Sequence, residues 1–287
     1  MAFDKVIVTG GSGQLGRYVV RELRAAGHGV TVVDLAPSEA GIPYAKGDVL
    51  DLPSLEAAFK GHEAIIHLAA LDLAIQTTQD NFMRVNVQGT WNVLQAAEAA
   101  GMKKAVICSS VAATGLGEMR GDWPPQYLPV DENHPTRPVH AYSVSKRVNE
   151  EIALSYVRRG NMSVICLRPL LVMFPSLIEK VMQREREGFR WLYYYVTPED
   201  TARAFRLALE VENVPYDVLH LTAADNCVEE PTFDMLRRNR ILPFPEVRLP
   251  LLYKRNPRAS VFDPERAKRV IGFEPSSDWL KARNQKA

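Results

Sequence analysis

Tyr142 and Lys146 are the two residues of this sequence best suited to moving a proton. They are four positions apart in a stretch that predicts a helix over residues 141–158, and residues four apart lie on one face of a helix. The ammonium of Lys146 is therefore expected near the phenol of Tyr142, whose ordinary pKa of about 10 makes it a poor base. A nearby positive charge favours the phenolate and lowers that pKa. The pair predicts a tyrosine that can act as a base.

A glycine-rich turn at residues 9–16 connects a strand pattern to a helix pattern. Gly10, Gly13 and Gly16 have the spacing G-x-x-G-x-x-G, and Gly11, Gly13 and Gly16 have the related G-x-G-x-x-G. Either spacing makes a tight turn, lets the backbone approach a pyrophosphate, and aims the N-terminus of a helix at its negative charge. We interpret the turn as part of a dinucleotide site.

Asp34 ends the next strand pattern, eighteen positions after Gly16, where such sites carry an acidic residue. Its carboxylate can accept hydrogen bonds from the ribose hydroxyls of NAD and would repel the 2′-phosphate of NADP. The two residues that follow, Leu35 and Ala36, are not basic. The sequence therefore predicts NAD as the cofactor.

In their order and spacing, these motifs resemble those of the extended short-chain dehydrogenases, in the nucleotide-sugar epimerase/dehydratase branch. Ser110 matches the position of the family's catalytic serine, with Ser109 beside it. The resemblance extends over nearly the whole chain. The other matching segments are G-D-hydrophobic at 47–49, H-x-A-A at 67–70, N-V-x-G-T at 86–90, Y-x-x-x-K at 142–146, R-P at 168–169 and a closing helix with its G-F-E-P at 263–275.

The resemblance implies that hydride passes between a substrate carbon and the nicotinamide of NAD. It implies that Tyr142 takes the proton of the substrate hydroxyl, that Ser110 hydrogen-bonds the same oxygen, and that Lys146 also reaches the nicotinamide ribose. Substrate contacts are expected from Ser110 and Arg168. The residues expected to contact NAD are Gly10, Gly13, Gln14, Leu15, Gly16, Asp34, Asp48, Val49, Leu68, Ala69, Ala70, Asn86, Tyr142, Lys146 and Pro169.

Four of the polar candidates also have structural interpretations. His67 is more typical of a packed strand-end histidine than of a catalyst, and Asn86 of a brace at a helix start than of a substrate ligand. Ser110 has the alternative of a strand-end capping residue. Arg168 can bind a substrate anion or anchor its loop, and the sequence leaves both open.

Repeated strand and helix patterns position these residues. They predict an α/β fold, a Rossmann-type doubly wound parallel sheet with right-handed crossovers, whose ligands bind at the carboxyl ends of the strands. A small mixed C-terminal substrate lobe is expected after residue 169. We predict an NAD-binding domain over 1–168 and 197–224, and a substrate-binding lobe over 169–196 and 225–287. The expected strands are 5–9, 29–33, 44–46, 64–67, 105–108, 163–167 and 218–221, and the expected helices 14–26, 52–60, 81–100, 141–158, 176–187 and 198–211.

The composition argues against several kinds of partner. The 287 residues have a net charge of +1, which indicates neither nucleic acid nor an anionic membrane, and we interpret the basic stretch 237–240 as a solvated helix end. No apolar run approaches the roughly 18 residues of a membrane span, and the first residues do not resemble a leader peptide. Cys108, Cys166 and Cys227 are odd in number and far apart, so we expect reduced core thiols, no metal site and a cytoplasmic protein.

Departures from the family's pattern concern the substrate. The chain lacks the Thr-Asp-Glu triplet of the 4,6-dehydratases, and its 169–196 segment is shorter than in relatives that hold a nucleotide diphosphate. The aromatic run 189–195 is expected to pack within the lobe. Two hypotheses follow: oxidation or reduction of a sugar, sugar acid or other small hydroxyl compound, and epimerisation of a nucleotide sugar through a transient keto intermediate. A non-catalytic NAD-sensing protein is a third.

A homodimer is also expected. The helices at 81–100 and 141–158 commonly form a two-fold interface in the family that the sequence resembles. Ala96, Ala97, Ala99 and Ala100 would allow the first of them to pack closely on a partner.

Overall fold

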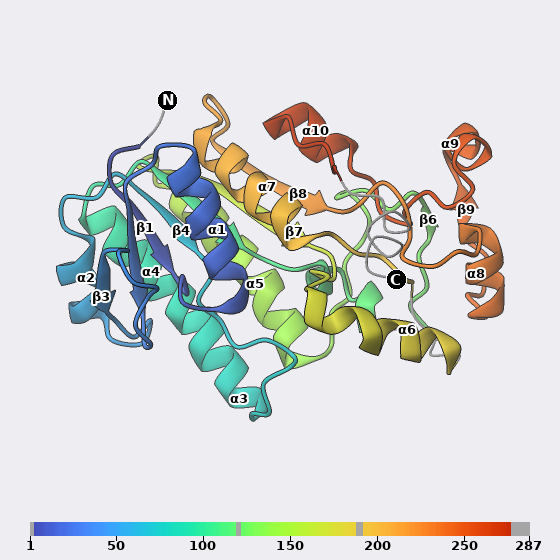
Figure 1. The fold of residues 1–287 in the computed structure, drawn as a ribbon, viewed down its shortest axis with the longest axis horizontal. Coiled ribbons are helices and arrows are strands. Elements are labelled where there is room, and N and C mark those ends of the chain that lie inside the picture. Colours follow the sequence, from blue (N-terminus) through green and yellow to red (C-terminus); the bar gives the residue numbers. More distant parts are fainter. Residues whose placement is uncertain (1–2, 119–121, 188–191, 277–287) are drawn as a thin grey trace.

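Seven short apolar strands form one parallel sheet, which is the framework of the molecule (Figure 1). Their order is β3-β2-β1-β4-β5-β7-β8, which confirms the expected Rossmann-type α/β fold. The computed structural model describes residues 3–118, 122–187 and 192–276. The strands are β1 Val6–Thr9, β2 Val30–Asp34, β3 Tyr44–Lys46, β4 Ala64–His67, β5 Lys104–Cys108, β7 Ser163–Pro169 and β8 Tyr216–Leu221.

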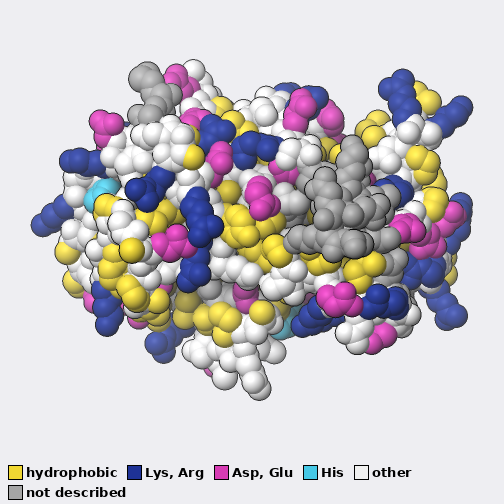
Figure 2. All heavy atoms as spheres, in the orientation of Figure 1, with side chains coloured by type: hydrophobic (Ala, Val, Ile, Leu, Met, Phe, Trp, Pro, Cys, Tyr) yellow, Lys and Arg dark blue, Asp and Glu magenta, His cyan; other side chains and the backbone are white. Residues whose placement is uncertain are grey.

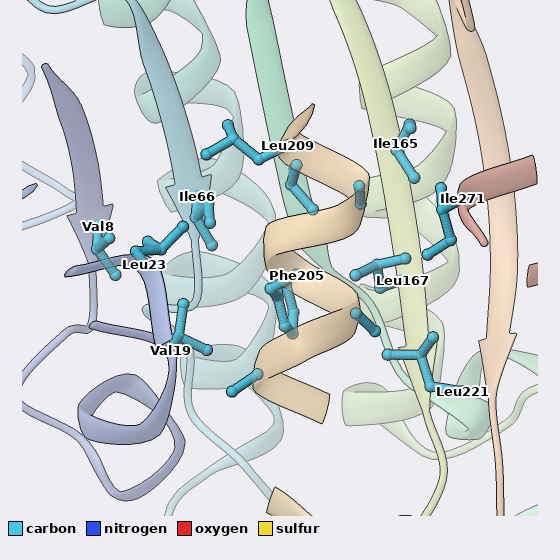
Figure 3. Packing of buried hydrophobic residues seen from close by; sticks show 14 of the residues in the cluster. Val8, Val19, Leu23, Ile66, Ile165, Leu167, Phe205, Leu209, Leu221 and Ile271 are labelled. Carbon is cyan, nitrogen blue, oxygen red and sulfur yellow. The ribbon is translucent and has the colours of Figure 1, made fainter. Parts of the chain in front are cut away.

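Helices cover both faces of this sheet because successive side chains of a strand point to opposite faces. Val8 and Ile66 pack against α1, α7 and α10 on one face, where Figure 3 shows Phe205 of α7. Ile7 and Ile65 pack against α2, α4 and α5 on the other face. The bounds of these helices are α1 Gln14–Ala25, α2 Leu52–Phe59, α4 Gly89–Ala99, α5 Ala141–Arg158, α7 Pro198–Glu210 and α10 Glu265–Ile271.

The strand order reverses between β1 and β4, because the chain first builds outward to β3 and then returns to the other side of β1. A crevice opens at the carboxyl ends of the strands at such a point, and ligands of open parallel sheets bind there. The glycine turn follows β1, and the H-x-A-A segment ends β4. The fold therefore brings these two motifs together.

The segment expected as one helix over 81–100 contains a wider turn. It begins as α3, Gln79–Phe82, continues as a π-helical turn over Met83–Gln88, and ends as α4. Within the π-helical turn Asn86 is fully buried. Gly89 follows it, where a Cβ would come within 2.7 Å of Val49, so this stretch lies tightly against the segment after β3. Such turns occur frequently at functional sites.

A second apolar cluster lies beyond the carboxyl ends of the strands, to the right in Figure 1. It contains Leu128, Phe262 and the buried Tyr193, Tyr194 and Tyr195, so these tyrosines pack as expected for the aromatic run; residues 189–191 of that run lie outside the described residues. The elements here are β6 Tyr127–Leu128, β9 Glu246–Val247, α6 Ile178–Arg186, α8 Thr232–Arg238, α9 Pro250–Arg255 and the short 3₁₀ turns Val111–Thr114, Leu116–Glu118 and Pro175–Leu177.

Two expectations about surfaces can be compared with the structure. Ala96 and Ala97 are fully buried in their own subunit's core, so the expectation that they face a partner is wrong: they lie on the side of α4 that covers the sheet. In the part of the chain that the structure describes, no helix is both long and apolar enough to cross a membrane.

Candidate active site

The glycine turn is crowded by the backbone around it. Gly10 has φ +72°, and a Cβ there would come within 2.6 Å of the amide nitrogen of Ala69, at the end of the neighbouring β4 segment. A Cβ on Gly16 would come within 2.2 Å of the Gly10 carbonyl oxygen. Gly13 is the N-cap residue of α1, and no side chain caps this helix. The first N–H groups of α1, at Gln14, Leu15 and Gly16, therefore lack intrahelical acceptors and suit an anion.

Asp34 ends β2 beside this turn. One oxygen of its carboxylate accepts a hydrogen bond from the Ser12 amide (3.1 Å) and the other from the Ala36 amide (3.2 Å). A carboxylate has about four lone-pair positions, so two remain for ribose hydroxyls. Asp34 therefore lies beside the glycine turn and keeps acceptor capacity, and its contact with the cofactor's ribose stays a prediction.

Ser110, Tyr142 and Lys146 meet at the carboxyl end of β5. A side-chain hydrogen bond links the Ser110 hydroxyl with the Tyr142 phenol and favours the phenolate, and the Ser110 hydroxyl oxygen accepts one from the Ala112 amide at 3.1 Å. The Lys146 ammonium lies 5.7 Å from the centre of the Tyr142 ring and donates to the Cys108 carbonyl oxygen at 2.9 Å. The fold therefore brings together the three residues that the sequence analysis selects.

Burial governs the protonation of this cluster. Burial raises the pKa of Tyr142, and the hydrogen bond from Ser110 only partly opposes that rise. Burial also lowers the pKa of Lys146. The expectation that Lys146 lowers the pKa of Tyr142 is therefore wrong for the protein alone: the phenol is kept neutral by desolvation.

Two loops hold the beginning of α5, and with it Tyr142, in place. The imidazole of His140 caps the helix by accepting a hydrogen bond from the Tyr142 amide (3.2 Å). Glu118 accepts hydrogen bonds from the amides of Val139 and His140, both at 3.0 Å. Glu118 follows the turn that Ser110 begins, so one loop positions both the serine and the tyrosine.

His67 and Asn86 are engaged in the protein's own hydrogen bonds. His67 lies between the hydroxyls of Thr9 (2.7 Å) and Thr90 (3.0 Å), and burial lowers its pKa to about 3. The amide of Asn86 accepts from the Leu71 amide (2.8 Å) and donates to the Leu71 carbonyl oxygen (3.0 Å). It also donates to Ser145 at 3.1 Å. Both residues brace the crevice, which is the structural interpretation that the sequence analysis gave each of them.

Arg168 is held inside the protein. Its Nε and Nη2 donate to the two carboxylate oxygens of Glu150 at 2.7 and 2.8 Å, and its Nη1 lies 3.3 Å from His220 Nε2. Its side chain is 4% exposed, and that of Glu150 is fully buried. Ser109 donates to the same carboxylate at 2.6 Å. Of the two roles left open for Arg168, the structure supports the anchor and gives no support to the substrate contact, since its donors face protein acceptors.

The remaining residues expected to contact NAD lie at the carboxyl ends of strands or shortly after them. Asp48 accepts a hydrogen bond from the Leu50 amide (2.9 Å), and the Val49 carbonyl oxygen accepts one from Asn92 (2.9 Å). The others, from strand ends and loops, are Leu68, Ala69 and Ala70 directly after β4, and Pro169 at the end of β7.

Asp72 is a residue at this site that the sequence analysis did not select. It is exposed, and its negative charge raises the pKa of both Tyr142 and Lys146. Its carboxylate accepts a hydrogen bond from the Ala74 amide at 2.8 Å, and the preceding Leu71 is fastened to Asn86. Only its position in the sequence, two residues after the H-x-A-A segment at 67–70, could have pointed to Asp72 as a site residue.

Comparison with known proteins identifies relatives of the chain. The model of the NAD dependent epimerase/dehydratase family matches residues 6–188. L-arabinose 1-dehydrogenase (NAD(P)(+)) of Haloferax volcanii is 30% identical over 212 residues, which are 72% of this chain and 82% of that protein. UDP-glucose 4-epimerase of Mus musculus is 34% identical over 173 residues, 52% of this chain and 48% of that protein. The chain thus spans about half the length of the second relative.

Solved structures share the fold. MoeE5 in complex with UDP-glucose and NAD is similar with a TM-score of 0.73 and 22% identity, over 99% of this chain and 100% of that chain. At this identity the likeness describes the arrangement of the backbone. It agrees with the seven-stranded parallel sheet and its flanking helices.

Proposed function

The chain belongs to the NAD-dependent epimerase/dehydratase family, and from this premise we propose that it oxidises or reduces a hydroxyl carbon of a sugar or similar small polyol with NAD, using Tyr142 as the general base. One observation carries the proposal. Ser110, Tyr142 and Lys146 cluster at the carboxyl end of β5, on the edge of the sheet where the glycine turn also lies.

The glycine turn fits the cofactor's pyrophosphate. The uncapped start of α1 offers backbone N–H groups to an anion, and the glycines at 10 and 16 let the turn fold tightly against the residues after β4 and against itself. When bound, NAD supplies a hydride acceptor and a positive nicotinamide ring, a charge that favours the phenolate of Tyr142 against the effect of burial. Asp34 provides the acceptors for the ribose hydroxyls.

In the oxidation, the substrate's C–H and O–H bonds break together. Tyr142 accepts the hydroxyl proton, and Ser110 donates a hydrogen bond to the same oxygen as it becomes a carbonyl. Lys146 holds its positive charge beside the phenol and keeps it oriented from the next turn of α5. The hydride leaves the carbon that bears this oxygen and would pass to the nicotinamide of bound NAD, so both the proton and the two electrons have an acceptor.

The charges at the site favour a neutral substrate. Arg168 is bound to Glu150, and the exposed acid whose negative charge acts on Tyr142 and Lys146 is Asp72. A carboxylate accepts hydrogen bonds from sugar hydroxyls and repels an acidic sugar. We therefore favour a neutral sugar over a sugar acid, in agreement with the likeness to L-arabinose 1-dehydrogenase.

Epimerisation of a nucleotide sugar is the second candidate, favoured by the likeness to UDP-glucose 4-epimerase over 52% of the chain. A panel of free sugars, sugar acids and nucleotide sugars, assayed with NAD, separates the two. Accumulating NADH with a free sugar supports the dehydrogenase. Conversion of a nucleotide sugar without net NADH supports the epimerase.

Tyr142→Phe tests the proposed base. We expect the rate on a verified substrate to fall by two or more orders of magnitude, because the variant cannot take the proton. NAD binding, measured by calorimetry, should be largely retained. Equal activity of the variant would refute the proposed chemistry, and a loss of NAD binding alone would leave the base unassigned.

The division of the chain into domains and its cellular environment belong to the same proposal. We infer the division into an NAD-binding domain over 1–168 and 197–224 and a substrate lobe over the rest. Side chains before residue 169, among them Val111 and Leu128, also pack in the second cluster.

We also infer a reducing, cytoplasmic environment, which the free thiols of Cys108, Cys166 and Cys227 suit.

A homodimer through α4 and α5 also remains our proposal. It is supported by the exposed Met83, in the turn that leads into α4, and the exposed Trp91, in the first turn of α4. Light scattering should give about twice the 32.2 kDa of one chain, and Trp91→Glu should reduce that mass. A monomeric wild-type mass would count against the interface.

A further inference from the structure

Large apolar side chains are exposed at the end of the molecule that lies farthest from the sheet. Leu242, Phe244, Leu249 and Leu251 are exposed by 69%, 37%, 46% and 63%. All four belong to one stretch, which runs from the end of α8 to the first turn of α9 (right side of Figure 1). Single exposed apolar residues are ordinary, but four in ten residues form a group that invites a partner.

Basic side chains surround this group. Residues 231–258 contain seven Lys and Arg and two Asp and Glu, whereas the whole chain has 35 and 34. Figure 2 shows Lys and Arg side chains gathered at this end of the molecule, with hydrophobic side chains among them. Arg238 and Arg258 of this stretch pair with Glu230 and Asp225, so the remaining cations give this end of a nearly neutral chain a modest positive charge.

The apolar and basic residues share a surface. Leu251 precedes Lys254 and Arg255 by three and four positions in α9, so all three lie on one face of that helix, while Tyr253 is buried on the other. The Arg237 guanidinium lies 5.5 Å from the centre of the Phe244 ring. We call Leu242, Phe244, Leu249, Leu251, Arg237, Arg248, Lys254 and Arg255 the distal surface.

Lys254 and Arg255 have no ion-pair partner among the described residues, so their charge is available to an external anion. Arg237 and Arg248 pair with Asp234 and Glu246, but these pairs are exposed and worth little. The interpretation of residues 237–240 as only a solvated helix end is therefore incomplete. Their charges belong to a larger surface.

We propose that the distal surface docks the protein on membranes that contain anionic phospholipid. Its apolar tips would enter the boundary between headgroups and acyl chains, and its cations would pair with lipid phosphates. The distal surface is at the end of the molecule opposite α2 and β3 (Figure 1), so a bilayer bound there would lie away from β1 and α1, between which the glycine turn runs. An acidic protein partner would need the cations but not the exposed leucines.

Vesicle flotation of the full chain tests this docking. The protein should float with vesicles of phosphatidylglycerol and phosphatidylcholine and remain behind with phosphatidylcholine alone. Lys254→Glu with Arg255→Glu should weaken binding by roughly fivefold or more for each charge, since each basic residue contributes about that factor at an anionic surface. Leu251→Ser should also weaken binding, because insertion needs the apolar tip.

Lys46→Glu with Lys60→Glu is the matched control, two exposed charges reversed at the opposite end of the molecule. It should bind vesicles like the wild type, and NAD binding by each variant shows that it is folded. The proposal is overturned if the wild type ignores anionic vesicles, if the control loses binding equally, or if Leu251→Ser has no effect. Binding to an acidic peptide without vesicle binding would also overturn it.

Discussion

Ser109 and Ser110 are neighbours with opposite surroundings. Ser109 is buried and donates to the buried Glu150, whereas Ser110 is half-buried and forms a hydrogen bond with Tyr142. Ser110→Ala should reduce the rate by one to two orders of magnitude, since a donor to the reacting oxygen is lost, and should lower the unfolding free energy by about 1 kcal/mol, since the cap on the Ala112 amide is lost as well. Ser109→Ala should lower the unfolding free energy by about 1–2 kcal/mol and keep most of the rate. Steady-state kinetics and chemical denaturation of both variants check the assignment; the reverse pattern would exchange their roles.

Asp72 and Asp80, two exposed acids in one segment, allow a second comparison of single residues. Asp72→Asn should reduce kcat/KM for a neutral sugar by about tenfold or more, because a charged hydrogen bond to a hydroxyl is lost. It should also move the acidic limb of the pH profile to lower pH, because Asp72 raises the pKa of Tyr142. Asp80→Asn, at an exposed acid in the same segment, is the control. An unchanged pH profile would remove Asp72 from the site.

Among the elements, the turn between β1 and α1 depends on space as well as on conformation. Gly10 and Gly27 both have positive φ, but a Cβ on Gly10 meets the Ala69 backbone, whereas one on Gly27 meets nothing within 4 Å. Gly27→Ala should cost about 1–2 kcal/mol of stability and leave NAD binding intact. Gly10→Ala should cost more and abolish NAD binding, since the turn must move away from β4. Calorimetry with NAD and thermal unfolding of the pair distinguish the two effects.

For the whole molecule, Glu132 joins the sheet to the second cluster. It accepts a hydrogen bond from the His220 amide at 2.7 Å, its side chain is 4% exposed, and burial raises its pKa from 4.5 to about 7. The folded protein therefore holds this proton more tightly than the unfolded chain. The stability that protonation provides is present at low pH and is lost as pH rises from about 4.5 to 7.

Glu132→Gln isolates this effect, because Gln keeps the oxygen that His220 needs. Relative to the wild type, its unfolding free energy should rise between pH 5 and 8, by at most about 3 kcal/mol. The variant has to be compared with the wild type because buried His67, with a pKa lowered to about 3, destabilises both proteins in acid. If the difference in unfolding free energy between the variant and the wild type stays constant with pH, the raised pKa of Glu132 is contradicted.

Much of the fold and part of the site could be predicted from local patterns. Short apolar runs such as 64–67 predict buried parallel strands, and a strand, a glycine turn and a helix in succession predict the dinucleotide crevice at Gly10. Tyr142 and Lys146 could be paired because a helix brings residues four apart together. These features depend on neighbours in the chain, whose relative geometry is nearly independent of the rest of the molecule.

The tertiary structure decided which way side chains face and what they meet. Whether Arg168 is free depends on Glu150, which comes from another element, and whether Ala97 faces a partner depends on which side of α4 covers the sheet. Burial reverses the expected pKa shift of Tyr142, and the approach of Asp72 depends on a loop held by Asn86. Burial and charge pairing arise from contacts between distant segments, so a linear pattern does not contain them.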